Sequence, residues 1–323
     1  MPHRYRAPAW LLGAHLQTVW PLLRKPAPPT YRRERWETPD GDFIDLDWID
    51  GPATAPLLVL FHGLEGSSHS HYARSLMRAI RRRRWRGVVV HFRGCSGEPN
   101  RLARAYHSGD SEEIDWILRR LGESGPLFSV GVSLGGNALL KWLGEQGAAA
   151  RRLIAAAAAI SAPLDLAASD ASLTRGVNRL YARHFLQRLV PKALEKLERY
   201  PGLYRADAVR AARSLGAFDD VVTAPLHGFR DAADYYARSS AKQFLAAIEV
   251  PTLLLNALND PFLPATALPG PGQMSSSLNL ETPNAGGHVG FVQGVFPGQL
   301  EWLPGRILAF FEQQIEKRNT RDK

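Results

Sequence analysis

A serine framed by two glycines is the stretch of this chain best suited to chemistry. Gly131, Ser133 and Gly135 form the pattern G-x-S-x-G, between an apolar strand-like segment at 126–132 and a helix-like segment from Asn137. A serine on such a sharp turn holds its Oγ clear of the sheet, and the glycines relieve a crossing that a Cβ would block. The helix N-terminus adds free N–H groups that suit a developing oxyanion. An ordinary turn is the alternative, but the flanking strand and helix favour a catalytic serine.

A serine hydroxyl needs a general base, and the base needs an acid that orients it. In an open parallel sheet these groups follow the carboxyl ends of strands. This rule points to Asp260, after the apolar segment at 253–257, and to His288, in a glycine-rich loop after the last expected strand. A turn aspartate before proline and a loop histidine are the alternatives. The order Ser133, Asp260, His288 is that of the elbow hydrolases and favours a catalytic triad.

Two backbone N–H groups are the candidates for an oxyanion hole. Leu64 lies in a loop that follows an apolar strand, and its N–H is expected to act together with that of Leu134, directly after the serine. Capping of a helix is the alternative role for either group. Of the other candidate side chains, we expect His62 to support this loop and His107 to be structural. We interpret Cys95 as a small buried residue.

Composition restricts the class of protein. The chain has 323 residues, of which 45% are hydrophobic, so it can form one large domain or a domain with an insertion. A single cysteine excludes an intrachain disulfide and favours a reducing compartment, so we expect a cytoplasmic location. The sequence contains neither a transmembrane-length apolar run nor a secretory signal. The oligomeric state does not follow from the sequence.

The net charge of +9 raises the question of anionic partners. Arginine is concentrated at 81–86 and 31–35, and a solvated helix end followed by a loop explains the first cluster. No nucleic-acid motif is present, so we expect no nucleic-acid partner, whereas peripheral contact with an anionic membrane stays open. No cluster has metal-ligand spacing and no phosphate-binding loop occurs, so neither a metal nor a cofactor is expected.

The periodicity of the chain predicts an α/β fold with an insertion. Apolar strands alternate with amphipathic helices, which predicts a mostly parallel sheet with helices on both faces. This core comprises residues 31–164 and 249–323, and residues 1–30 look like an arm laid over it. Residues 165–248 lack strand-like runs and are helical in composition, which predicts a helical insertion.

The helical insertion follows one parallel strand and precedes another, so it must emerge at the catalytic edge of the sheet. Leu180, Tyr181, Phe185, Leu186 and Leu189 follow helical spacing and predict an apolar face. Two interpretations stay open. The insertion is a cap that covers Ser133 and sets acyl-chain preference, or this face only packs on the sheet edge.

The chain also resembles a known family. The elbow and several other blocks are similar to those of the α/β-hydrolases, specifically the YheT-like branch related to eukaryotic ABHD lipases and esterases. The resemblance covers nearly the whole chain. The blocks that carry it lie at residues 13–18, 62–67, 92–97, 106–110, 131–137, 259–261 and 287–291.

The resemblance implies a serine hydrolase that acts on carboxylic esters, including acylglycerols and short-chain esters. Ser133 would be the nucleophile, His288 the general base and Asp260 its orienter, with a small ester or lipid as substrate. A thioesterase or amidase with the same triad is an alternative, and so is a binding protein that keeps the fold without activity.

Overall fold

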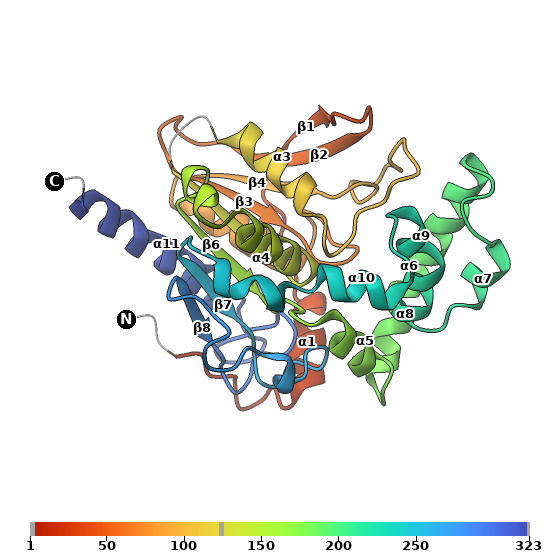
Figure 1. The fold of residues 1–323 in the computed structure, drawn as a ribbon. Coiled ribbons are helices and arrows are strands. Elements are labelled where there is room, and N and C mark those ends of the chain that lie inside the picture. The colour runs from red at the N-terminus through yellow and green to blue at the C-terminus, as the bar shows by residue number, and fades with distance from the viewer. Residues whose placement is uncertain (1–3, 123–125, 322–323) are drawn as a thin grey trace.

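The computed structural model describes residues 4–122 and 126–321, and Figure 1 shows them as a twisted sheet covered by helices on both faces. The eight strands follow the order β1-β2-β4-β3-β5-β6-β7-β8. Their bounds are β1 (Arg32–Glu37), β2 (Phe43–Ile49), β3 (Leu57–Phe61), β4 (Arg86–His91), β5 (Leu127–Val132), β6 (Ala156–Ile160), β7 (Thr252–Leu255) and β8 (Leu278–Glu281).

Strands β3 to β8 run parallel to one another, as the alternation of strands and helices predicted. Strand β2 pairs antiparallel with both β1 and β4, which makes the first two strands an antiparallel edge. The residues of β3, β5 and β6 are buried throughout, because helices cover both faces of these strands. The α/β-hydrolase architecture predicted for the core is therefore the observed one.

Helices α2 and α11 cover one face of the sheet and α3 and α4 the other, so two hydrophobic cores flank the strands. The helices are α1 (Ala14–Leu23), α2 (His71–Arg82), α3 (Ser111–Leu121), α4 (Leu134–Gln146), α5 (Leu166–Leu173), α6 (Asn178–Arg199), α7 (Ala206–Ala211), α8 (Leu215–Phe218), α9 (Ala224–Leu226), α10 (Ala232–Ser239) and α11 (Trp302–Arg321). Short helical turns are η1 (Gly147–Arg152), η2 (Asp219–Thr223), η3 (Ala241–Ala247) and η4 (Ala265–Ala267).

Strand β2 buries acidic residues among its apolar ones. Asp45 and Asp47 are buried, and each accepts two hydrogen bonds from an arginine of β1 at 2.8–2.9 Å. These partners, Arg35 and Arg33, lie opposite them in the antiparallel register. Arg33, together with His91 and a serine, holds the pKa of Asp47 well below its usual range against the opposing effect of burial. Cross-strand ion pairs thus compensate the charges that this edge buries.

Residues 165–248 form the segment between β6 and β7 and contain α5 to η3, with no strand among them. Figure 1 shows this segment at the right of the sheet, with α6 as its longest element. Pro191 lies inside α6. Proline has no N–H, so the carbonyl of Gln187 loses its hydrogen bond within the helix. The helix continues because Pro191 and Gln187 both lie on its exposed side.

One prediction about the apolar face of α6 was wrong. Leu180 is 65% exposed rather than packed. The other four predicted residues do pack: Leu186 is buried, and Tyr181, Phe185 and Leu189 are partly buried against the hydrophobic clusters of this segment. Hydrophobic spacing therefore predicted the helix and most of its packed face, but not the exposure of Leu180 in its first turn.

The N-terminal segment contains the short helix α1 and lies against the core. The hydroxyl of Tyr5 donates to the carbonyl of Val292 at 2.8 Å, and Trp20 of α1 donates to the carbonyl of Pro297 at 2.9 Å. Within residues 4–122 and 126–321, no helix has the length and apolar character required to cross a membrane.

Candidate active site

Ser133 lies on the turn between β5 and α4. Its φ of 52° and ψ of −120° are rare for an L-residue, so the backbone is strained there. A Cβ on Gly131 would lie 2.4 Å from the carbonyl oxygen of Gly135, and one on Gly135 would lie 2.5 Å from that of Phe61. Only glycine therefore allows the strand and helix to cross this closely and to present the serine at the carboxyl edge of the sheet.

The structure brings Ser133, His288 and Asp260 into one hydrogen-bonded line. Nε2 of His288 lies 3.0 Å from Oγ of Ser133, and Nδ1 lies 2.8 Å from Oδ2 of Asp260. A carboxylate accepts hydrogen bonds, so Nδ1 donates to Asp260 and Nε2 is left to accept from the serine hydroxyl. The N–H of Phe262 donates to Oδ1 of Asp260 at 2.9 Å, and the Phe262 ring stacks on the imidazole at 4.2 Å between centroids. These contacts fix the carboxylate and the ring.

The loop that carries His288 rests on α1, a contact that sequence reasoning missed. The hydroxyl of Thr18 accepts a hydrogen bond from the backbone N–H of His288 at 2.9 Å. The side-chain oxygen of Gln17 accepts two, from the N–H of Gly286 and from the amide of Asn259, each at 2.9 Å. Polar side chains of the N-terminal arm thus position both loops that supply His288 and Asp260.

Glycines beside His288 were the sequence signal for this contact. A Cβ on Gly287 would lie 2.7 Å from the backbone nitrogen of Thr18, and one on Gly290 would lie 2.0 Å from the carbonyl oxygen of Gln17. Two such glycines indicate that another segment approaches closely. The identity of that segment, 270 residues away along the chain, cannot be deduced from local patterns.

The N–H groups of Leu64 and Leu134 are both free, as an oxyanion hole requires. The N–H groups on either side of Leu64 are occupied, because they donate to the hydroxyls of Tyr72 and Tyr106 at 2.9 and 2.8 Å. Leu134 is the first residue of α4, so its N–H has no acceptor within the helix. Neither leucine N–H donates to any residue in the ranges 4–122 and 126–321. This arrangement leaves two donors beside Ser133 for a bound oxyanion.

His62 supports the Leu64 loop, as its position predicted. It is fully buried, its Nε2 accepts from the N–H of Phe92 at 3.1 Å, and its Nδ1 donates to the carbonyl of Gly63 at 2.7 Å. Burial lowers the pKa of His62 to about 3, so the ring is neutral and keeps this tautomer at ordinary pH.

His107 and Cys95 line the cavity beside the triad. Nδ1 of His107 accepts from the N–H of Gly109 at 3.1 Å, and burial lowers the pKa of His107 to about 3. This neutral, occupied ring agrees with a structural role. Cys95 was expected to be buried but is partly exposed at the cavity wall. Burial still raises the pKa of its thiol to about 12, so it stays protonated and a poor nucleophile.

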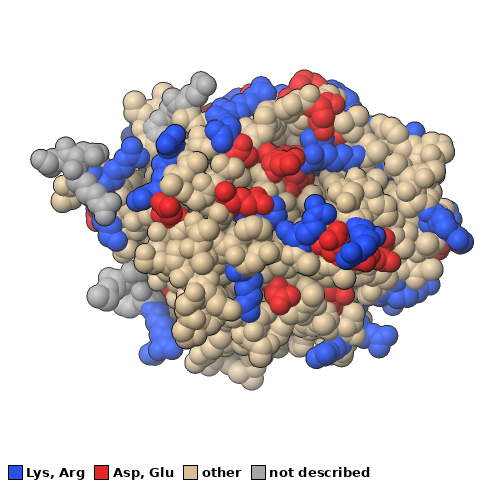
Figure 2. All heavy atoms as spheres, in the orientation of Figure 1, with Lys and Arg blue, Asp and Glu red and all other residues tan. Residues whose placement is uncertain are grey.

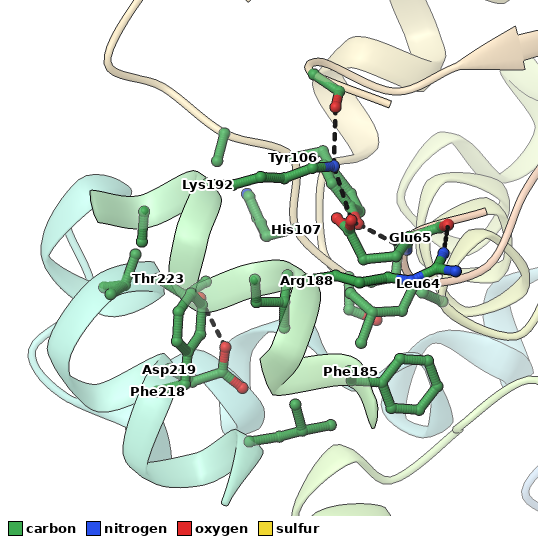
Figure 3. A pocket seen from close by; sticks show the side chains of 18 of the residues that line it. Leu64, Glu65, Tyr106, His107, Phe185, Arg188, Lys192, Phe218, Asp219 and Thr223 are labelled. Atoms are coloured by element: carbon green, nitrogen blue, oxygen red, sulfur yellow. Dashed lines mark hydrogen bonds and ion pairs between the residues drawn. The ribbon is translucent and has the colours of Figure 1, made fainter. Parts of the chain in front are cut away.

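A cavity of about 660 Å³ extends from Ser133 into the 165–248 segment. Its volume falls within the roughly 300–1,000 Å³ of small-molecule sites. Figure 3 shows Leu64 and Glu65 of the core on one wall and Phe185 and Phe218 of the helical segment on others. Most of the lining is apolar, so the cavity suits an apolar group attached to the carbonyl that reaches Ser133.

Helix α6 also holds the loop that contains Leu64. Nζ of Lys192 lies 2.7 Å from Oε2 of Glu65 and 2.9 Å from the carbonyl oxygen of Gly94. The hydroxyl of Tyr106 donates to the other oxygen of Glu65 at 2.9 Å. Figure 3 shows Lys192 reaching across the cavity wall to Glu65. The helical segment is therefore tied to the residue next to a candidate oxyanion donor.

Phe185 and Leu186, neighbours on α6, differ in position. Phe185 is half-buried, lines the cavity and lies 6.2 Å from Phe262 between ring centroids. Leu186 is buried in the segment's own core, with Ala193 and Phe218, and it is not part of the cavity wall. Only the first of the two is placed to contact a substrate.

Asp219 introduces a carboxyl group into the far wall of the cavity. It begins the π-helical turn η2, and its oxygens accept from the hydroxyls of Thr223 at 2.6 Å and Tyr236 at 2.8 Å. Figure 3 shows the pairing of Asp219 with Thr223. Burial raises the pKa of Asp219 to about 7, so the group is largely neutral below that pH.

Sequence comparison agrees with the fold and the serine turn. The profile of the alpha/beta hydrolase fold family matches residues 56–295. The chain therefore belongs to the α/β-hydrolase family.

The relatives narrow this family to the predicted branch. YheT of Escherichia coli (strain K12), named as a candidate esterase, is 41% identical over 316 residues, which cover 95% of this chain and 92% of YheT. Phospholipase ABHD3 of Mus musculus is 29% identical over 326 residues, which cover 97% of this chain and 79% of ABHD3. The Pyrococcus furiosus esterase Pf2001 has a similar structure, with a TM-score of 0.55 at 15% identity over 88% of this chain and 92% of its own. That structural likeness shows the fold.

Proposed function

We propose that this protein hydrolyses carboxylic esters through an acyl-enzyme on Ser133. The observation that carries the proposal is the alignment of Asp260, His288 and Ser133, at 2.8 and 3.0 Å, at one end of a largely apolar cavity. The names of YheT and ABHD3, an esterase and a phospholipase, support an ester as the bond that is cleaved.

The chemistry follows from the hydrogen bonds of the site. Oγ of Ser133 attacks the ester carbonyl carbon while Nε2 of His288 takes the hydroxyl proton, and Asp260 stabilises the imidazolium. The oxyanion that forms accepts from the N–H groups of Leu64 and Leu134. Collapse breaks the C–O bond, and the alcohol leaves with the proton from His288. Water then attacks the acyl-enzyme and gives its proton to His288, which returns it to Ser133 as the acid departs.

In this proposal the chain is divided as its sequence indicated. Residues 1–30 are an arm that supports the loop with the general base His288. Residues 31–164 and 249–323 are the catalytic core, and residues 165–248 are a cap over the substrate. The cavity wall supports the cap assignment, because residues such as Phe185 and Phe218 face the same cavity as Ser133. A cap of this kind excludes water and selects acyl chains by length.

Labelling and turnover together test the proposal. A fluorophosphonate should label wild-type protein and fail to label Ser133→Ala, whereas a binding protein without activity would not react. The wild type should hydrolyse p-nitrophenyl esters faster than the matched thioester and anilide. Faster thioester or anilide cleavage would move the assignment to a thioesterase or amidase.

A further inference from the structure

Helix α1 buries polar residues and exposes apolar ones. Its buried residues are Gln17, Thr18 and Pro21, and the first two accept hydrogen bonds from the loop that carries His288. Its exposed face is apolar and includes Leu16, at 55% exposure, and Leu23, at 70%. A helix on the surface of a globular protein ordinarily has the opposite arrangement, with its apolar stripe packed inward. The outward apolar stripe is the arrangement expected of a helix that contacts a partner outside the chain.

The stripe belongs to a larger surface, which we call the apolar face. Nine of the ten strongly exposed large hydrophobic residues in the described part of the chain occur in three segments: the N-terminal arm, the start of α6 and the loop before α11. These nine are Leu12, Leu16, Val19, Leu22, Leu23, Val177, Leu180, Val295 and Phe296. Exposed apolar residues that gather in this way mark an interaction site, whereas scattered ones need no explanation.

Direct contacts join the three segments into one surface. The ring of Phe296 lies 5.4 Å from that of Trp10 and 5.8 Å from that of Trp20 in α1. Nδ1 of His15 lies 3.2 Å from the hydroxyl of Tyr181 in α6. The arm thus bridges the Phe296 loop and the start of α6.

Two of these three segments are basic, and none of the three contains an acidic residue. Residues 4–31, 171–194 and 282–300 include nine lysines and arginines and not one aspartate or glutamate. Five of the cations, Arg24, Lys25, Arg175, Arg179 and Arg183, are exposed and form no ion pair with any residue that the structure describes. In Figure 2 the lower edge of the molecule, where Figure 1 places α1, is mainly uncharged with basic side chains beside it.

We propose that the apolar face docks this protein on the surface of an anionic lipid bilayer. The exposed leucines and valines would enter the boundary between head groups and acyl chains, and tryptophan is suited to the same depth. The unpaired cations would contact anionic head groups. A second copy of the chain fits less well, because a symmetric contact would bring the same unpaired cations together.

Docking of this face would place the catalytic loop next to the membrane. The residues of α1 that hold the His288 loop, Gln17 and Thr18, lie on the opposite side of the same short helix. Membrane binding nonetheless needs no turnover, so its measurement stands whether or not the protein cleaves esters.

Vesicle sedimentation tests the charge requirement with a matched pair of variants. Wild-type protein should sediment with vesicles of phosphatidylcholine and phosphatidylglycerol, and much less with phosphatidylcholine alone. Arg24→Glu/Lys25→Glu should weaken binding at least about tenfold, since each cation near the surface contributes about 1 kcal/mol. The control, Arg81→Glu/Arg82→Glu, changes the net charge equally at exposed positions at the end of α2, next to the amino-terminal end of β4 rather than the carboxyl ends of the strands, where the His288 loop lies. It should bind as the wild type does.

Site-specific fluorescence tests insertion itself. Cys95 is partly buried with its thiol pKa raised to about 12, so an environment-sensitive maleimide should label Leu23→Cys selectively. On anionic vesicles the emission at position 23 should shift to the blue, and emission from a matched Arg82→Cys label should not. Circular dichroism on each variant checks that it is folded.

Three results would overturn the proposal. The first is wild-type protein that fails to sediment with anionic vesicles. The second is equal loss of binding in the charge variants of α1 and α2, which would show nonspecific attraction. The third is a dimer in light scattering that Leu23→Glu dissociates, because it would show that a second copy covers the face.

Discussion

Replacement of Thr18 by valine is expected to slow turnover without weakening substrate binding. The Thr18 hydroxyl accepts from the backbone N–H of His288 at 2.9 Å and donates to the carbonyl of Ala14 at 2.8 Å. Valine keeps the side-chain shape but leaves the His288 N–H without a partner, which costs about 1–3 kcal/mol. The loop relieves this cost by moving, and the movement displaces Nε2 of His288 from the serine. If the full cost falls on the transition state, kcat decreases about 5- to 150-fold.

Steady-state kinetics on p-nitrophenyl butyrate separate this effect from others. In Thr18→Val, kcat should fall while KM changes less than about twofold, because the cavity wall is untouched. Thr18→Ser keeps the hydroxyl and should stay within about threefold of the wild type. A Thr18→Val enzyme with wild-type kcat would refute the positioning role. Equal losses in both variants would also refute it, since they would assign the effect to the lost methyl group.

Three further predictions concern the helical segment. Burial raises the pKa of Asp219 from 3.8 to about 7, so the folded protein holds a proton that the unfolded chain has lost, and stability falls as pH rises from about 4 to about 7. Asp219→Asn should remove this decline. If the melting temperatures of the variant and the wild type fell by the same amount between about pH 4 and about pH 7, the prediction would be contradicted. Phe185→Ala should raise kcat/KM for long relative to short p-nitrophenyl esters by about tenfold, since each buried methylene contributes about 0.8 kcal/mol. Leu186→Ala should instead lower the melting temperature and leave the acyl preference unchanged, and identical ester profiles for the two variants would refute the distinction. Lys192→Met, which removes the ion pair with Glu65, should lower kcat about two- to fivefold with little change in melting temperature, and an unchanged kcat would show that this pair does not hold the loop.

The core of the fold and the positions of the candidate triad residues could be predicted because local signals determine them. Continuous apolar runs such as Leu57–Phe61 predicted strands covered on both faces. The glycines of the G-x-S-x-G pattern predicted the sharp turn at Ser133. The structure shows why they are needed, since a Cβ at Gly131 or Gly135 would clash with backbone oxygens. Asp260 and His288 followed from the rule that functional groups gather beyond the carboxyl ends of parallel strands.

Long-range pairings could not be predicted. The contact between Thr18 and the His288 loop joins residues 270 positions apart, and the glycines at the loop indicated a close approach without naming the partner. The exposure of Leu180 could not be deduced from helical spacing, because the four other residues of the same predicted face are buried or partly buried. A surface helix ordinarily buries its apolar residues, but α1 buries polar ones, because these support the loop that carries His288. The cytoplasmic location inferred from the single cysteine remains a prediction.

Detection of an acyl group on Ser133 tests the proposed chemistry most directly. Wild-type protein mixed with a p-nitrophenyl carbamate, which deacylates slowly, should release one equivalent of nitrophenol in a burst and gain the mass of one carbamoyl group. Peptide mapping should place that group on Ser133, and Ser133→Ala should show neither burst nor adduct. A wild-type enzyme that turns over esters without an adduct, or an adduct on any other residue, would contradict the acyl-enzyme mechanism.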